Sequence, residues 1–120
     1  MKKILICDDS ATDLANLKSA LQSTECTLLT AIDGQEAVSK AKEQQPDVIF
    51  MDIVMDGMDG FAACRCLRDD PATKHIPVIM VSSKQQKADR AWAQMQGAKD
   101  LIGKPFDAKE ILAKLASLQA

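Results

Sequence analysis

Five short apolar runs alternate with amphipathic segments along this chain, and this alternation restricts the fold more than any other feature of the sequence. Three of the runs are uninterrupted and cover 4–7, 48–51 and 78–81. Continuous apolar runs of this length are typical of strands that are buried on both faces of a sheet. We also expect a weaker strand at 26–32 and a short one at 101–102.

Segments with helical periodicity lie between and after these runs. In three of them, apolar residues spaced three or four apart form a stripe that is expected to pack on the sheet: Leu14, Leu17 and Leu21; Ala88, Ala91, Trp92 and Met95; and Ile111, Leu112, Leu115 and Leu118. A less regular helix is expected from about 59 to 68. The pairs Asp33 with Glu36 and Asp107 with Glu110 have the spacing of capping boxes, which predicts the start of one further helix at Asp33 and the start of the last helix at Asp107.

The resulting order is a strand followed by a helix, repeated five times. This order predicts an α/β fold with a doubly wound, five-stranded parallel sheet and helices on both faces. With 120 residues, the chain is too short for an eight-fold barrel. We expect one domain over residues 1–120, without an output domain.

Charge and composition exclude several functional classes. The formal net charge of −2 gives no general attraction to nucleic acid or to an anionic membrane. No apolar run approaches the roughly 20 residues that are needed to cross a bilayer. Since Asp8 and Asp9 follow the first apolar run at once, the N-terminus does not resemble a signal peptide. We therefore expect a cytoplasmic protein that neither binds nucleic acid nor enters a membrane.

The four cysteines are expected to be reduced thiols. Cys7 and Cys26 lie at the edges of apolar runs, as small buried side chains do. Cys64 and Cys66 are two apart on a predicted helix, so their side chains point to different sides and cannot share a metal or a disulfide. A redox or metal role for these thiols is the less favoured alternative.

Polar residues follow the predicted strands at the points where each strand ends. Asp8 and Asp9 follow the first run, Asp52 the third, Ser82 the fourth, and Lys104 the fifth. Because parallel strands end at one edge of the sheet, where ligands bind at the switch in strand order, these side chains are expected to converge. Taken singly, each has a simpler explanation as a helix cap, a turn or a loop residue.

Three carboxylates with an ammonium group and a hydroxyl suit phosphoryl transfer. Close carboxylates repel one another unless a cation intervenes, and Mg²⁺ is the hard, oxygen-binding cation that fits. An aspartate can act as the nucleophile and form an aspartyl phosphate. Mg²⁺ and Lys104 would offset the charge on the phosphoryl oxygens.

Four stretches of the sequence resemble the response regulator receiver family, with its CheY-like, flavodoxin-like fold: ILICDDS, PDVIFMDIVMDGMDG, IPVIMVSS and GAKDLIGKP. The resemblance implies the strand order 2-1-3-4-5 and a cis Lys104–Pro105 peptide bond. It also implies the following roles: Asp52 as phosphoacceptor, Asp8, Asp9, Asp52 and the Val54 carbonyl as Mg²⁺ ligands, Ser82 as the hydroxyl that turns toward the phosphoryl group, and Lys104 as its cationic partner.

The resemblance further implies partners and a pathway. A histidine kinase, CheA-like, would donate the phosphoryl group, and a downstream protein would bind the face of the fourth helix, fifth strand and fifth helix. We expect a monomeric switch that catalyses only its own phosphorylation and slow dephosphorylation. The stretches MDIVMDG and AWAQMQGAKD resemble PilH-type single-domain receivers of the chemotaxis-like system that controls type IV pili and twitching motility. A phosphate sink for the same kinase is the alternative, and a small Mg²⁺-dependent phosphohydrolase is a less favoured one.

Two positions depart from the family pattern. Asp56 stands where the family usually has proline, which adds a negative charge beside the phosphorylation site. Leu101 stands where the family has the switch aromatic, so an aromatic flip cannot transmit the signal. Trp92 is expected to pack in the core, with a partner contact as the alternative. The same core role is expected for five methionines: Met51, Met55, Met58, Met80 and Met95.

Overall fold

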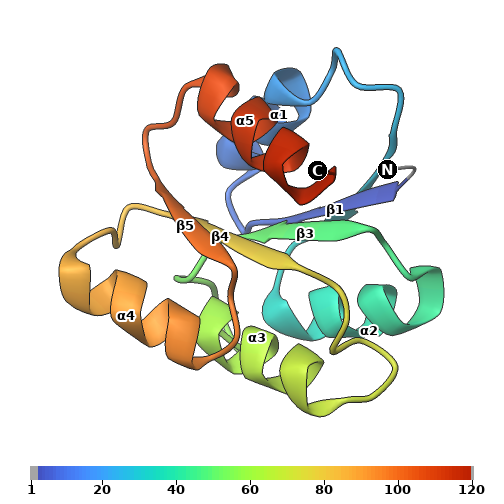
Figure 1. The fold of residues 1–120 in the computed structure, drawn as a ribbon, viewed down its shortest axis with the longest axis vertical. Helices are drawn as coiled ribbons and strands as arrows, with labels where there is room; N and C mark the ends of the chain where they lie inside the picture. Colours follow the sequence, from blue (N-terminus) through green and yellow to red (C-terminus); the bar gives the residue numbers. More distant parts are fainter. Residues whose placement is uncertain (1–2, 120) are drawn as a thin grey trace.

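The computed structural model describes residues 3–119, and within them five strands alternate with five helices (Figure 1). The strands are β1 (Lys3–Cys7), β2 (Thr27–Ala31), β3 (Val48–Met51), β4 (Val78–Ser82) and β5 (Asp100–Gly103). The helices are α1 (Ala11–Ala20), α2 (Gly34–Gln44), α3 (Gly60–Asp69), α4 (Lys87–Met95) and α5 (Ala108–Gln119). The predicted alternation of strands and helices is confirmed.

All strands are parallel and lie in the order β2-β1-β3-β4-β5, as predicted. Helices α1 and α5 cover one face of the sheet, and α2, α3 and α4 cover the other (Figure 1). The chain moves outward from β1 to β2 and then returns to β3 on the opposite side of β1. In such sheets, ligands bind outside the carboxyl ends of the strands at this point of reversal, which here lies at β1 and β3.

The sheet is buried on both faces, which explains why its central strands are continuously apolar. In β1, Ile4 and Ile6 pack under α1 and α5, whereas Leu5 and Cys7 pack toward α2 and α3. All four are fully buried. Full burial of one such aliphatic side chain stabilises a fold by about 1.5–3 kcal/mol. The rigid strands therefore supply a fixed platform for the polar residues that follow them.

The two predicted capping pairs do mark helix starts, although neither is a complete capping box. Asp33 Oδ1 accepts a hydrogen bond from Glu36 N at 2.8 Å, but the Glu36 carboxylate accepts from Ile32 N. At the other pair, Asp107 N donates to Glu110 Oε1 at 3.2 Å. Helices α2 and α5 begin directly after Asp33 and Asp107.

The sequence prediction for α4 was wrong about which side of the helix faces the core. All members of its apolar stripe are exposed, namely Ala88, Ala91, Trp92 and Met95. Trp92 is 46% exposed and Met95 is 65% exposed. The buried residue of α4 is Ala93, whose small side chain lets the helix lie close to the sheet. Trp92 stays outside and packs edge-on against Phe61 of α3, with 6.4 Å between ring centroids.

The other side-chain predictions have mixed outcomes. Met51, Met55 and Met80 are buried, as expected, but Met95 is not. No disulfide joins the cysteines within residues 3–119. No helix in this range combines the length and apolar character that a bilayer crossing requires.

Candidate functional site at the carboxyl edge of the sheet

Three carboxylates meet where β1 and β3 end. The pairing of Cys7 with Met51 places Asp8 beside Asp52, and Asp52 N donates to Cys7 O at 3.0 Å. One oxygen from each of Asp8, Asp9 and Asp52 lies within 4.8 Å of the others. Asp8 and Asp52 are buried and Asp9 is exposed, so the cluster is closed from below and open to solvent above.

Asp52 is held from two sides. Its Oδ1 accepts hydrogen bonds from Ile53 N at 2.7 Å and Val54 N at 3.3 Å. Its Oδ2 accepts from Lys104 Nζ at 3.1 Å. Bonds of this kind, in which one partner is charged, fix a carboxylate more firmly than neutral ones do. The Asp52 carboxylate therefore has a defined orientation within the cluster.

Lys104 reaches the cluster from the end of β5. Its Nζ donates to Asp8 at 2.7 Å and to Asp13 at 2.9 Å, in addition to Asp52. Burial alone would lower the pKa of Lys104, but the bonds to these carboxylates outweigh it and raise the pKa above its ordinary value. The ammonium is charged at all physiological pH values. The Lys104–Pro105 bond is cis, as predicted.

The charges of the cluster do not balance. Burial raises the pKa of Asp8, and the charge of Asp52 adds to that effect, whereas bonds from Lys104 and Ser10 N oppose it. The net pKa of Asp8 is raised, because burial together with the charge of Asp52 outweighs the bonds from Lys104 and Ser10 N. Carboxylate oxygens with this spacing and an excess of negative charge are the donor set that a hard divalent cation such as Mg²⁺ prefers.

Ser82, at the end of β4, is fully buried. Its Oγ accepts a hydrogen bond from Lys84 N at 3.2 Å. The backbone of the same residue reaches the site more directly, because Ser82 O accepts from Lys104 N at 3.0 Å. The structure thus brings Asp8, Asp9, Asp52 and Lys104 together through their side chains and ties Ser82 to Lys104 through the main chain.

One member of this site was missed by the sequence analysis. Asp13 lies in the first turn of α1, where an acidic residue is already explained by the helix dipole. Asp13 follows Asp8 by five residues and therefore stays near the end of β1. The periodicity of helices and strands does not indicate that it contacts Lys104. The contact depends on the packing of α1 beside α5 and on the loop that follows β5, so it became visible only in three dimensions.

Comparison with known proteins agrees with this geometry. The response regulator receiver domain family matches residues 4–116. Protein PilH of Pseudomonas aeruginosa is 41% identical over 120 residues, covering 100% of this chain and 99% of PilH. Protein PilG of the same organism is 35% identical over 113 residues, covering 94% of this chain and 84% of PilG. The chain belongs to the response regulator receiver family.

Solved structures place this receiver among CheY-like proteins. The chemotaxis response regulator CheY4 of Vibrio cholerae has a TM-score of 0.90 at 30% identity, with 98% of each chain covered. CheY of Borrelia burgdorferi, solved in a complex with CheX, BeF3 and Mg, has a TM-score of 0.92 at 30% identity. That match covers 99% of this chain and 90% of the other.

The two departures from the family pattern have clear structural settings. Asp56 N donates to Asp9 Oδ2 at 3.2 Å, a bond that a proline at this position could not make, and this bond ties the loop after β3 to the acidic cluster. Leu101 is buried in the core beneath α4. Its carbonyl accepts a hydrogen bond from Arg90 Nη1 at 2.7 Å, which links β5 to α4 through the main chain.

Proposed function

We propose that this receiver accepts a phosphoryl group on Asp52 from a CheA-like histidine kinase in the cytoplasm. The observation that carries the proposal is the setting of the Asp52 carboxylate. It is held between two loop amides and the Lys104 ammonium, in the middle of an acidic cluster that needs a cation. A carboxylate fixed in this way is a nucleophile whose product can be stabilised where it forms.

In the proposed transfer, an Asp52 carboxylate oxygen bonds to the phosphorus of a phosphohistidine. The P–N bond breaks, and the imidazole nitrogen of the donor keeps the electron pair. Lys104 then exchanges carboxylate bonds for bonds to phosphoryl oxygens, where negative charge has been added. The Ser82 hydroxyl leaves the Lys84 amide and turns toward the same group, since a bond to a charged acceptor is stronger.

The metal ligands in this proposal are Asp8, Asp9, Asp52 and the main-chain carbonyl of Val54. Mg²⁺ bound there supplies the positive charge that brings an anionic donor to an acidic cluster. Two observations support this assignment: the excess of carboxylates over cations, and the exposed position of Asp9 at the open side of the cluster. Asp8 lies deepest, and we infer that it acts partly through a metal-bound water.

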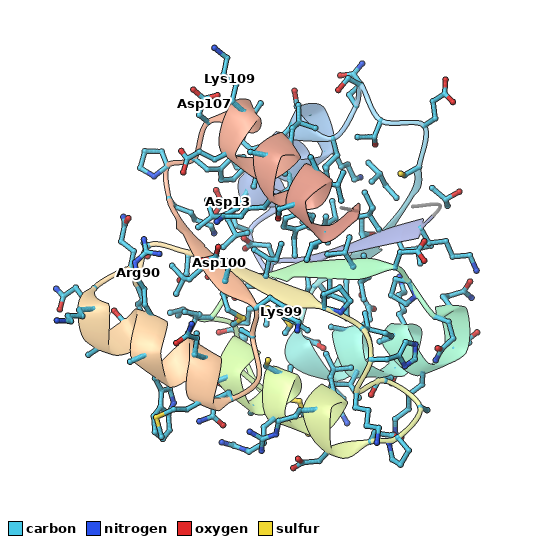
Figure 2. The ribbon with its side chains drawn as sticks, in the orientation of Figure 1. Asp13, Arg90, Lys99, Asp100, Asp107 and Lys109 are labelled. Atoms are coloured by element: carbon cyan, nitrogen blue, oxygen red, sulfur yellow. The ribbon has the colours of Figure 1, made fainter. Side chains whose placement is uncertain are left out.

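We further propose that output is the binding of a downstream protein at the α4–β5–α5 face, in a chemotaxis-like pathway that controls type IV pili. Main-chain and ionic links join the three elements of this face. Arg90 of α4 bonds to the carbonyl of Leu101 in β5, and Lys114 of α5 pairs with Asp100. Figure 2 shows Arg90 on α4 and Asp100 on β5. Lys87 and Gln94 of α4 line a groove with Asp100 and Leu101 of β5 at this face.

Phosphotransfer from a purified, radiolabelled histidine kinase tests the central step. We expect label to move to the wild-type chain and to Asp56→Asn, a matched loss of one carboxylate four residues away, but not to Asp52→Asn. Full labelling of Asp52→Asn contradicts the assignment. Repeated turnover of a small phosphate ester by the wild type would favour a phosphohydrolase instead.

Affinity capture with beryllofluoride and Mg²⁺ tests the output face. We expect Gln94→Arg, which adds a bulky charge to α4 beside β5, to weaken capture of the downstream protein at least tenfold, whereas Gln22→Arg, the same change at an exposed position after α1, leaves capture unchanged. Equal losses in both variants contradict the proposed face. Stoichiometric phosphorylation without any phosphorylation-dependent partner would favour a phosphate sink.

A further inference from the structure

Lys104 has a carboxylate partner that lies outside the acidic cluster. Asp13, in the first turn of α1, accepts a hydrogen bond from Lys104 Nζ at 2.9 Å. Asp8 and Asp52 accept from the same nitrogen at 2.7 Å and 3.1 Å. A lysine ammonium has three N–H donors, so these three carboxylates account for all of them.

Asp13 differs from the other two acceptors in its relation to a bound cation. The oxygens close enough to share a metal come from Asp8, Asp9 and Asp52. A cation bound at that position would be coordinated by oxygens of Asp8 and Asp52, and the hydrogen bonds from Lys104 to these two carboxylates would weaken. Of the three acceptors, Asp13 is the one whose bond to Lys104 a metal leaves intact.

A cleft beside the site can accommodate the Lys104 side chain in a second conformation, turned away from Asp52. It has a volume of about 600 Å³ and is lined by Lys104 itself, Asp13 and Asn16, together with Phe106 of the β5–α5 loop. Figure 2 shows Asp13 in the region between α5 and β5. Without a retaining bond, a long cationic side chain gains conformational freedom and hydration by turning into such a cleft.

We propose that Asp13 is a positioning residue that keeps the Lys104 ammonium at the phosphorylation site once a cation has taken up Asp8 and Asp52. One N–H of Lys104 stays on Asp13, and the other two are released toward phosphoryl oxygens. The proposal rests on the proposed function of Asp52. It assigns Asp13 no contact with the phosphoryl group, because its effect acts through Lys104.

Phosphorylation by acetyl phosphate, followed by intact mass, tests this role without a kinase. An Asp52 oxygen bonds to phosphorus, the P–O bond to the acetyl group breaks, and acetate leaves with the electron pair. The rate is measured against Mg²⁺ concentration for the wild type, Asp13→Asn, Asp13→Glu and Asp56→Asn. Asp56→Asn removes the same charge from the loop after Asp52 but has no hydrogen bond to Lys104 among residues 3–119.

We expect both asparagine variants to need more Mg²⁺ for half-maximal rate, because each removes a negative charge. Only Asp13→Asn should lower the plateau rate at saturating Mg²⁺, by about tenfold, as the loss of one bond to a charged group predicts. Asp13→Glu should recover most of that loss. An unchanged plateau in Asp13→Asn, or an equal loss in Asp56→Asn, overturns the positioning role while leaving Asp52 as acceptor. A wild-type chain that acetyl phosphate does not label overturns both proposals.

Discussion

Individual charges at the site work against the stability of the fold. Burial raises the pKa of Asp8, and repulsion by the neighbouring Asp52 carboxylate raises it further. Lys104 offsets this repulsion only in part, because its donors are divided among three acceptors. The arrangement favours binding of a cation and a phosphoryl group over maximal stability, as functional sites commonly do.

Asp52→Asn should therefore remove the phosphoacceptor without unfolding the protein. The substitution removes one like charge from the cluster, while Lys104 keeps its bonds to Asp8 and Asp13. In the absence of Mg²⁺ we expect a melting temperature equal to or above that of the wild type, measured by circular dichroism. A melting temperature lower by ten degrees or more would show that Asp52 holds the strand ends together.

The path by which phosphorylation reaches the α4 surface cannot include an aromatic side chain at position 101, because this residue is leucine. Leu101 is buried beneath α4 and lacks the planar ring that lets an aromatic residue choose between a buried and an exposed position. The loop from Ser82 to the start of α4 lies between the site and Trp92. We expect phosphorylation to move this loop and α4 more than residue 101, because a population shift needs contacts that differ between the two states.

Leu101→Ala should separate stability from signalling. Truncating this buried side chain should lower the free energy of unfolding by about 2–5 kcal/mol in urea titrations. The Trp92 fluorescence change on adding beryllofluoride and Mg²⁺ should persist in the folded variant. Loss of that change in a variant that is still folded and phosphorylated would identify Leu101 as a coupling residue.

The ion pair between β5 and α5 should contribute stability only above acidic pH. Burial opposes ionisation of Asp100, but its bonds to Lys114 and to Leu101 N prevail and lower the pKa below the model-compound value of 3.8. A carboxyl with a lowered folded-state pKa stabilises the fold above its unfolded pKa, and this contribution is lost as the pH falls through the folded value. Asp100→Asn should cost less than about 1 kcal/mol at pH 7, because the pair is partly exposed. The difference should shrink as the pH falls below 3.8 in urea titrations, and a difference that does not change with pH would contradict this account.

Strands and site residues differ in how far the sequence alone could predict them. The runs at 48–51 and 78–81 were recognisable because burial on both faces leaves no polar residue in them. Asp8, Asp52 and Lys104 could be grouped because parallel strands end at one edge. The orientation of α4 could not be predicted, since its spacing fits a buried stripe and only the packing of Ala93 selects the other side. Asp13 could not be paired with Lys104 because it lies on a helix and not at a strand end, so the shared edge of the sheet does not group the two.

Across the whole molecule, cation binding should be coupled to stability. The cluster exists only when β1 and β3 are paired, so a cation that binds there binds the folded state alone. Mg²⁺ at 100 times its dissociation constant should add about 2.7 kcal/mol to the free energy of unfolding. Asp9→Asn should lose most of this gain, whereas the exposed carboxylate variant Asp56→Asn should keep most of it. Thermal melts with tens of millimolar Mg²⁺ that show no shift for the wild type would contradict a magnesium site.

The central claim is that Asp52 carries the phosphoryl group, and chemical trapping of the acyl phosphate tests it most directly. Borohydride reduces an aspartyl phosphate to homoserine, which marks the acceptor residue permanently in the peptide chain. After phosphorylation with Mg²⁺ and a phosphodonor, peptide mass spectrometry should find homoserine at position 52, and none when Mg²⁺ is chelated. Homoserine at another aspartate, or a phosphorylated protein without homoserine at position 52, would contradict the account.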